Sequence, residues 1–88
     1  MNIIVKKLSD PEIKNMGIEK WQVWTKEISK FDWFYDSQEM CLILEGEAII
    51  KSDFEEVTIK KGDYVLFPVG LKCTWNITSP IKKYYNFK

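Results

Sequence analysis

The sequence contains no histidine and only two cysteines, Cys41 and Cys73, among its 88 residues. Imidazole is the usual nitrogen ligand for zinc, iron, nickel and copper, so a metal site of the common histidine type is excluded. A histidine is also the usual base that activates a cysteine nucleophile. We therefore expect both thiols to be small buried hydrophobic groups in a reducing compartment, neither nucleophiles nor a disulfide.

The sequence also lacks a long apolar run and a net charge. Its longest apolar stretch, residues 40–44, is far shorter than a membrane span, and no apolar leader with a cleavage site is seen. Thirteen basic and thirteen acidic residues balance, which gives no electrostatic reason to bind nucleic acid or an anionic membrane. The basic pairs, Lys82-Lys83 among them, are interpreted as solvated strand edges. These absences predict a cytoplasmic protein without nucleic-acid or membrane partners.

What the sequence does contain is a series of short strand patterns separated by turns. Side-chain alternation predicts that Glu39 shares one strand face with Cys41 and Ile43, and that this face points inward. Gly46 is expected to form a turn or bulge before a return strand that starts at Ala48. Further strands are expected at residues 2–8, which suit an edge, and at 21–28, 31–35, 56–60, 64–67, 72–77 and 84–87. Such strands favour an all-β antiparallel sandwich or barrel.

One short helix is expected before the second strand. Ser9 is a typical helix cap, Glu12 follows at the capping-box spacing, and Pro11 suits the first turn. Gly17 fits the end of this helix. We find no linker or internal repeat, so residues 1–88 are expected to form a single domain.

With these strands in place, the chain resembles a small single-domain cupin. Glu39, six residues and Gly46 match the second half of the first cupin motif. Gly62, five residues, Pro68-Val69-Gly70 and two residues match the second motif and lead to Cys73. The closing run, residues 75–77 and 80–85, resembles the ureidoglycine aminohydrolase-like branch of the superfamily. The whole chain is most similar to compact stand-alone cupins of unassigned function. The resemblance implies a double-stranded β-helix, or jelly-roll barrel.

The departures from the cupin pattern concern the metal ligands. Cupin enzymes generally hold a metal ion with histidines and the motif glutamate, and here only Glu39 survives. With four residues between the second histidine position and Glu39, the first two histidine positions fall on Asp32 and Phe34; with three residues, they fall on Trp33 and Tyr35. The third histidine position falls on Cys73. Glu39 and Asp32 would make a poor cage for a hard ion. We therefore expect no metal cofactor, with a divalent metal at Glu39 and Cys73 as the alternative.

Two interpretations of Glu39 stay open. It is either a ligand-binding carboxylate or general base, and thus the best candidate for a catalytic residue, or a scaffold carboxylate that is hydrogen-bonded inside the barrel. In both cases a buried carboxylate needs a partner, which is Tyr35, Lys26 or a ligand. The aromatic rings at the former histidine positions either plug the barrel or line a pocket.

Three functions follow from these residues. The first is a metal-free cupin that binds a small amphipathic or cationic molecule. Its predicted ligand-binding residues are Trp33, Tyr35, Glu39, Cys73 and Trp75. The second is an enzyme resembling ureidoglycine aminohydrolases that acts on a small nitrogenous or carboxylate metabolite. The third is a structural or regulatory subunit with a plugged barrel.

A homodimer is also expected. Residues 40–44 are apolar on both strand faces, so both faces must be covered. The other sheet covers one face, and the N-terminal segment or another subunit covers the second. This pattern predicts a dimer through an outer sheet face or by strand exchange.

Overall fold

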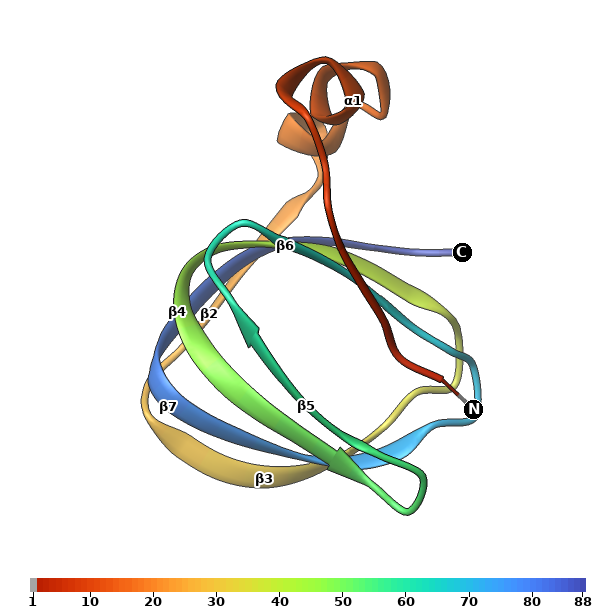
Figure 1. Cartoon of the computed structure of the whole chain (residues 1–88), viewed down its shortest axis with the longest axis vertical. Helices are drawn as coiled ribbons and strands as arrows, with labels where there is room; N and C mark the ends of the chain where they lie inside the picture. Colours follow the sequence, from red (N-terminus) through yellow and green to blue (C-terminus); the bar gives the residue numbers. More distant parts are fainter. Residues whose placement is uncertain (1) are drawn as a thin grey trace.

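The computed structural model describes residues 2–88 and consists mainly of antiparallel strands. The strands are β1 (Ile4–Lys7), β2 (Gln22–Lys26), β3 (Ser29–Phe34), β4 (Glu39–Ser52), β5 (Glu56–Lys60), β6 (Asp63–Phe67) and β7 (Lys72–Phe87). The helix α1 (Asp10–Asn15) and the 3-10 segment η1 (Ile18–Lys20) lie between β1 and β2. The strands curl into a barrel with the helical segment at one end (Figure 1), which confirms the predicted all-β architecture.

The long strands β4 and β7 pair with each other along most of their length. The first part of β4 also pairs with β6, and its last part pairs with β5. In the same way, the two parts of β7 pair with β3 and then with β2. Each long strand therefore takes part in two walls of the barrel. Strand β1 pairs only with β6, at the edge of the sheet, as predicted.

The bend that joins the two walls lies at Gly46. Its φ is 91°, and the register of β4 against β7 shifts between Ile43 and Ala48. A Cβ atom at this position would collide with the backbone carbonyl of Pro80 on β7, so glycine is required for the close approach. The prediction of a return strand from Ala48 is wrong, because β4 continues as one bulged strand. The two predicted strands at 72–77 and 84–87 likewise form one strand through Pro80.

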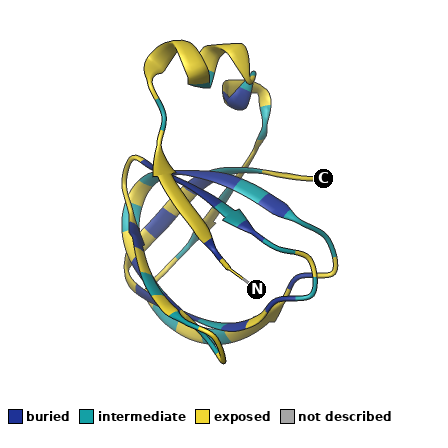
Figure 2. Ribbon diagram, turned by 45° about the vertical axis from the view of Figure 1, so that its right-hand side comes forward, coloured by how far each residue is buried: buried dark blue, intermediate teal, exposed yellow. Residues whose placement is uncertain are grey.

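The barrel interior is filled by apolar side chains. Cys41 and Ile43 are buried together with Glu39, which confirms the predicted inward face of β4. Their main neighbours in the core are Tyr35, Ile50, Ile59, Val65, Phe67, Leu71, Trp75, Ile77 and Ile81. Buried and exposed residues thus alternate along the barrel strands, whereas α1 and β1 are mostly exposed (Figure 2).

The N-terminal segment covers part of the outer face. Helix α1 begins with the predicted capping box, in which the Ser9 hydroxyl accepts a hydrogen bond from the Glu12 backbone at 3.3 Å and the Glu12 side chain accepts one from the Ser9 backbone at 3.0 Å. The following segment η1 buries Ile18 against Leu42 and Tyr64. The N-terminal segment, one of the two covers expected from the sequence, therefore packs on the second face of β4. Neither helical element within residues 2–88 has the length and apolar character needed to span a bilayer.

Candidate functional site

An ion pair lies inside the barrel between the first residue of β4 and a residue of β7. Glu39 Oε2 is 2.6 Å from Lys83 Nζ, and the two side chains are only 4% and 7% exposed. A buried carboxylate requires such a partner because it has lost its hydration. The sequence left Tyr35, Lys26 or a ligand as the partner of Glu39, and the structure shows Lys83 in that role instead of Tyr35 or Lys26. Lys26 instead lies over the ring of Phe31, at 5.7 Å from its centroid.

Three aromatic rings surround the ammonium group of Lys83. Its Nζ atom lies 4.8 Å from the ring centroid of Trp24, 4.7 Å from that of Trp75 and 6.0 Å from that of Tyr85. At these distances the negative ring faces attract the cation and partly replace its lost water. The interpretation of Lys82-Lys83 as a solvated edge is therefore wrong for Lys83, although Lys82 is exposed.

Tyr35 lies beside the ion pair and links it to the core. Its hydroxyl accepts a hydrogen bond from Trp75 Nε1 at 3.2 Å, and its ring stacks on Phe67 with 4.8 Å between centroids. Burial, with a smaller contribution from the charge of Glu39, raises the pKa of Tyr35 far above its usual range. The hydroxyl group therefore keeps its proton and remains a hydrogen-bond donor.

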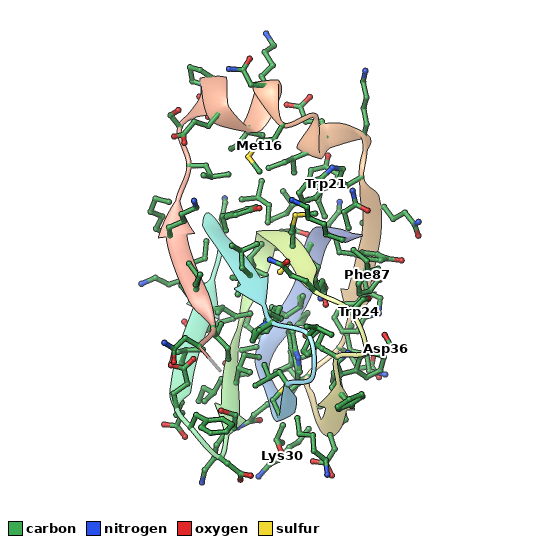
Figure 3. The ribbon with its side chains drawn as sticks, turned by 90° about the vertical axis from the view of Figure 1, so that its right-hand side faces the viewer. Met16, Trp21, Trp24, Lys30, Asp36 and Phe87 are labelled. Carbon is green, nitrogen blue, oxygen red and sulfur yellow. The ribbon has the colours of Figure 1, made fainter. Side chains whose placement is uncertain are left out.

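These groups line one open cleft of about 780 Å³, which we call the aromatic cleft. It is lined by residues of β2 and β3, of β7 with which both strands pair, and by Glu39 at the start of β4. Its lining residues are Trp24, Thr25, Lys26, Glu27, Phe31, Asp32, Trp33, Tyr35, Glu39, Trp75, Lys83, Tyr85 and Phe87. Trp24 and Phe87 lie on the same side of the barrel (Figure 3). Trp33 and Phe87 are 50% and 47% exposed, so this cleft offers uncovered aromatic surface.

The structure brings together four of the five residues that the sequence predicts as ligand-binding. Trp33, Tyr35, Glu39 and Trp75 line the aromatic cleft. Cys73 does not, and it borders a neighbouring hollow of about 900 Å³ over β3, β4 and β7, which shares Asp32 and Trp33 with the cleft. Sequence reasoning missed six lining residues that are aromatic or charged: Trp24, Glu27, Phe31, Lys83, Tyr85 and Phe87.

A signal for Lys83 was present in the sequence. Buried Ile81 precedes it by two residues and Tyr85 follows it by two, so a continuous strand would place all three on one face. Recognising that pattern required a strand through Pro80, where the sequence indicated an interruption.

Both thiols lie in the core and are poor nucleophiles. Burial raises the pKa of Cys41 to about 12 and that of Cys73 to about 11. At neutral pH both groups are therefore protonated. This agrees with the expectation that they act as small apolar side chains.

The side chains at the cupin ligand positions do not fit a metal ion. The carboxylate of Glu39 is already bound by an ammonium group at 2.6 Å. Asp32 pairs with Thr74 on the opposite face of β3 from Trp33, and its carboxylate accepts a hydrogen bond from the Thr74 hydroxyl at 3.0 Å. Within residues 2–88, no three Cys, Asp or Glu side chains gather closely enough to hold a metal ion. A metal bound by Glu39 and Cys73 would have to displace Lys83.

Comparisons with known proteins agree with the architecture. The family model of the EutQ-like cupin domain matches residues 14–85. A crystal structure of a DUF861 family protein from Thermotoga maritima is 40% identical, with 99% of this chain and 100% of that chain covered and a TM-score of 0.97. The comparison with curated proteins found no match.

More distant structures share the fold alone. The EutQ protein of Clostridium difficile is 19% identical, with 97% of this chain and 66% of that chain covered and a TM-score of 0.69. A putative ethanolamine utilization protein Q from Salmonella typhimurium is 16% identical, with 99% and 69% covered and a TM-score of 0.68. The predicted cupin jelly roll is thereby confirmed.

Proposed function

The chain belongs to the EutQ-like cupin family, and we propose that it binds a small molecule in the aromatic cleft without a metal ion. The observation that carries this proposal is the buried Glu39–Lys83 pair, which lines an open cleft of about 780 Å³. Ligand sites typically have volumes of roughly 300–1,000 Å³, mostly apolar walls and a few fixed polar groups. The aromatic cleft has each of these properties.

The two other functions suggested by the sequence have less support. A plugged barrel would leave no space beside Glu39, whereas Glu39 lines an open cleft. An enzyme resembling ureidoglycine aminohydrolases would use Glu39 as a base or metal ligand, whereas Lys83 already engages this carboxylate. Membership of the ureidoglycine aminohydrolase-like branch stays a prediction.

Native mass spectrometry combined with elemental analysis of the purified protein tests the proposal. We expect a metal-free chain that carries a non-covalent small molecule. Glu39→Gln should lose this molecule, because the amide cannot replace the charge opposite Lys83. The control is Glu47→Gln, which changes an exposed glutamate of the same strand and should retain it. Circular dichroism of both variants separates loss of the ligand from loss of the fold.

Two results would contradict the proposal. Stoichiometric manganese, zinc or iron that disappears in Glu39→Gln would favour the enzyme. A protein with neither metal nor small molecule, and with no probe binding in the cleft, would favour the plugged subunit.

A further inference from the structure

The charges and hydrogen-bonding groups of the aromatic cleft indicate which class of molecule it takes, an inference that rests on the proposed function. A cationic ligand is disfavoured. Aromatic rings attract cations, but here the faces of Trp24 and Trp75 already attract the ammonium group of Lys83. A second cation placed there would be repelled by the first and would find no vacant ring cage.

An anionic ligand is disfavoured as well. The positive charge of Lys83 is already matched by Glu39 at 2.6 Å. Of the remaining charged side chains that line the cleft, Lys26 is positive and Glu27 is negative, while Asp32 is bound by Thr74 on the other face of β3. The cleft therefore offers no unmatched positive charge to an anion, and an anion would also lose its hydration on entry.

The ion pair nevertheless has unused hydrogen-bonding capacity. Lys83 has three N–H donors and gives one of them to Glu39 Oε2. Glu39 lines the cleft, and no hydrogen bond to its Oε1 atom is found within residues 2–88, so this oxygen is left to accept one from a ligand. The Tyr35 hydroxyl accepts from Trp75 and has its own proton to donate. The cleft therefore offers a ligand one acceptor, Glu39 Oε1, and two kinds of donor, the Lys83 ammonium group and the Tyr35 hydroxyl.

We propose that the aromatic cleft binds a neutral molecule whose polar head places a hydrogen-bond acceptor next to a donor, as a primary amide does, on a flat apolar body. The head accepts hydrogen bonds from Lys83 and Tyr35 and donates one to Glu39 Oε1. The body covers the exposed rings of Trp33 and Phe87. Such a head satisfies the ion pair without adding a charge to the cleft.

Three probes with the same ring test the charge of the head: benzamide is neutral, benzoate is an anion and benzylammonium is a cation. The indole Nε1–H signals report binding in NMR titrations at pH 7. Trp24, Trp33 and Trp75 line the cleft, while Trp21 packs in the outer cluster with Ile18 and serves as an internal control. We expect benzamide to shift the three cleft signals in a saturable way, with a Kd about tenfold or more below the other two, and to leave Trp21 unchanged.

Tyrosine variants test where the head binds. Tyr35→Phe keeps the ring that stacks on Phe67 but removes the donor, and should weaken benzamide binding by about 3- to 10-fold. Tyr64→Phe changes a tyrosine of the outer cluster and should have no effect. An unchanged Kd in Tyr35→Phe would overturn the proposed position of the head.

The outcomes also separate this inference from the proposed function. If benzoate or benzylammonium shifts the cleft signals with equal or higher affinity, the neutral-head inference is overturned while the binding cleft stands. If none of the three probes shifts those signals, the neutral-head inference is overturned, and the proposed binding function is overturned with it when native mass spectrometry also finds neither a metal nor a bound small molecule.

Discussion

Lys83 is able to remain buried because several neighbours together replace its hydration. Glu39 supplies an opposite charge at 2.6 Å, and the rings of Trp24, Trp75 and Tyr85 surround the ammonium group. Each partner depends on the others, because burying an unpaired charge in such surroundings lowers the stability of the fold by several kcal/mol. The pair therefore acts as a unit in stability as well as in recognition.

The first prediction concerns this pair. Lys83→Met keeps an apolar stem of similar length but leaves Glu39 without a partner, so we expect a loss of about 3–5 kcal/mol in the free energy of unfolding. Adding Glu39→Gln removes the unpaired charge and should restore a large part of that loss. Lys82→Met, at the exposed neighbour, should change the free energy by less than about 0.5 kcal/mol. Urea unfolding followed by tryptophan fluorescence measures all three, and a double variant less stable than Lys83→Met would refute coupling.

The second prediction concerns the thiol of Cys41. Burial raises its pKa from 9.0 to about 12 in the folded chain, so its contribution to stability is complete below pH 9 and is lost as the pH rises towards 12. At pH 10.5 the unfolded thiol is ionised and the folded one is not, which costs about 2 kcal/mol. We expect the fall in Tm between pH 8 and 10.5 to be smaller in Cys41→Ala than in the original chain. An equal fall in Tm in the two chains would show that the Cys41 thiol does not contribute to the pH dependence of stability.

The inward position of Glu39 was predictable from the sequence, but its partner was not. Alternation alone places Glu39 with Cys41 and Ile43. Lys83 was assigned to the solvent because lysine is almost never fully buried unless paired, and the pair joins residues 44 positions apart. Local patterns carry no information about such a distant contact.

At the scale of elements, Gly46 and Pro80 decide the shape of the barrel. Both residues usually end strands, so the sequence indicated breaks there. In the structure the bend of β4 brings Gly46 against the backbone of Pro80, and each strand continues through the contact. By contrast, the capping box of α1 was predicted correctly because Ser9 and Glu12 contact each other locally.

A pair of glycine variants tests the role of this contact. Gly46→Ala adds a methyl group that collides with the Pro80 carbonyl and also strains a φ of 91°. Gly17→Ala strains a similar φ of 66° but meets no atom within 4 Å. We expect Gly17→Ala to cost about 1 kcal/mol and Gly46→Ala clearly more, at least about 2–3 kcal/mol. Thermal unfolding followed by circular dichroism compares them, and equal losses would mean that the backbone contact is unimportant.

At the scale of the whole molecule, one apolar row on the outer face is only partly covered, since Met40 and Leu66 are half-buried beside the cluster around Ile18 and Ile4 is exposed. Leu66 on β6 pairs in register with Ile4 on β1 and with Met40 on β4. Ile3 is buried in the barrel, so alternation places Ile4 outside, where it is 49% exposed. This row is the part of the outer face on which the predicted homodimer would form.

Light scattering after gel filtration tests the dimer. We expect a mass of about twice 10.5 kDa, and a shift towards the monomer in Ile4→Lys, because a charge would be buried at the interface. Ile28→Lys, which changes an equally apolar but 63% exposed residue between β2 and β3, should leave the mass unchanged. A monomeric original chain at all concentrations would refute the dimer.

Strand β7 has a consequence for how the chain is made in the cell. It pairs with β2, β3 and β4, so the centre of the sheet is the strand that leaves the ribosome after all the others. Contacts over such long sequence separations form late and slowly. A stalled ribosome or a proteolytic cut before residue 72 therefore leaves strands without their common partner, and Lys83 reaches Glu39 only in the step that closes the barrel. A chain that stops there also lacks Trp75, Lys83 and Tyr85, so it has no aromatic cleft.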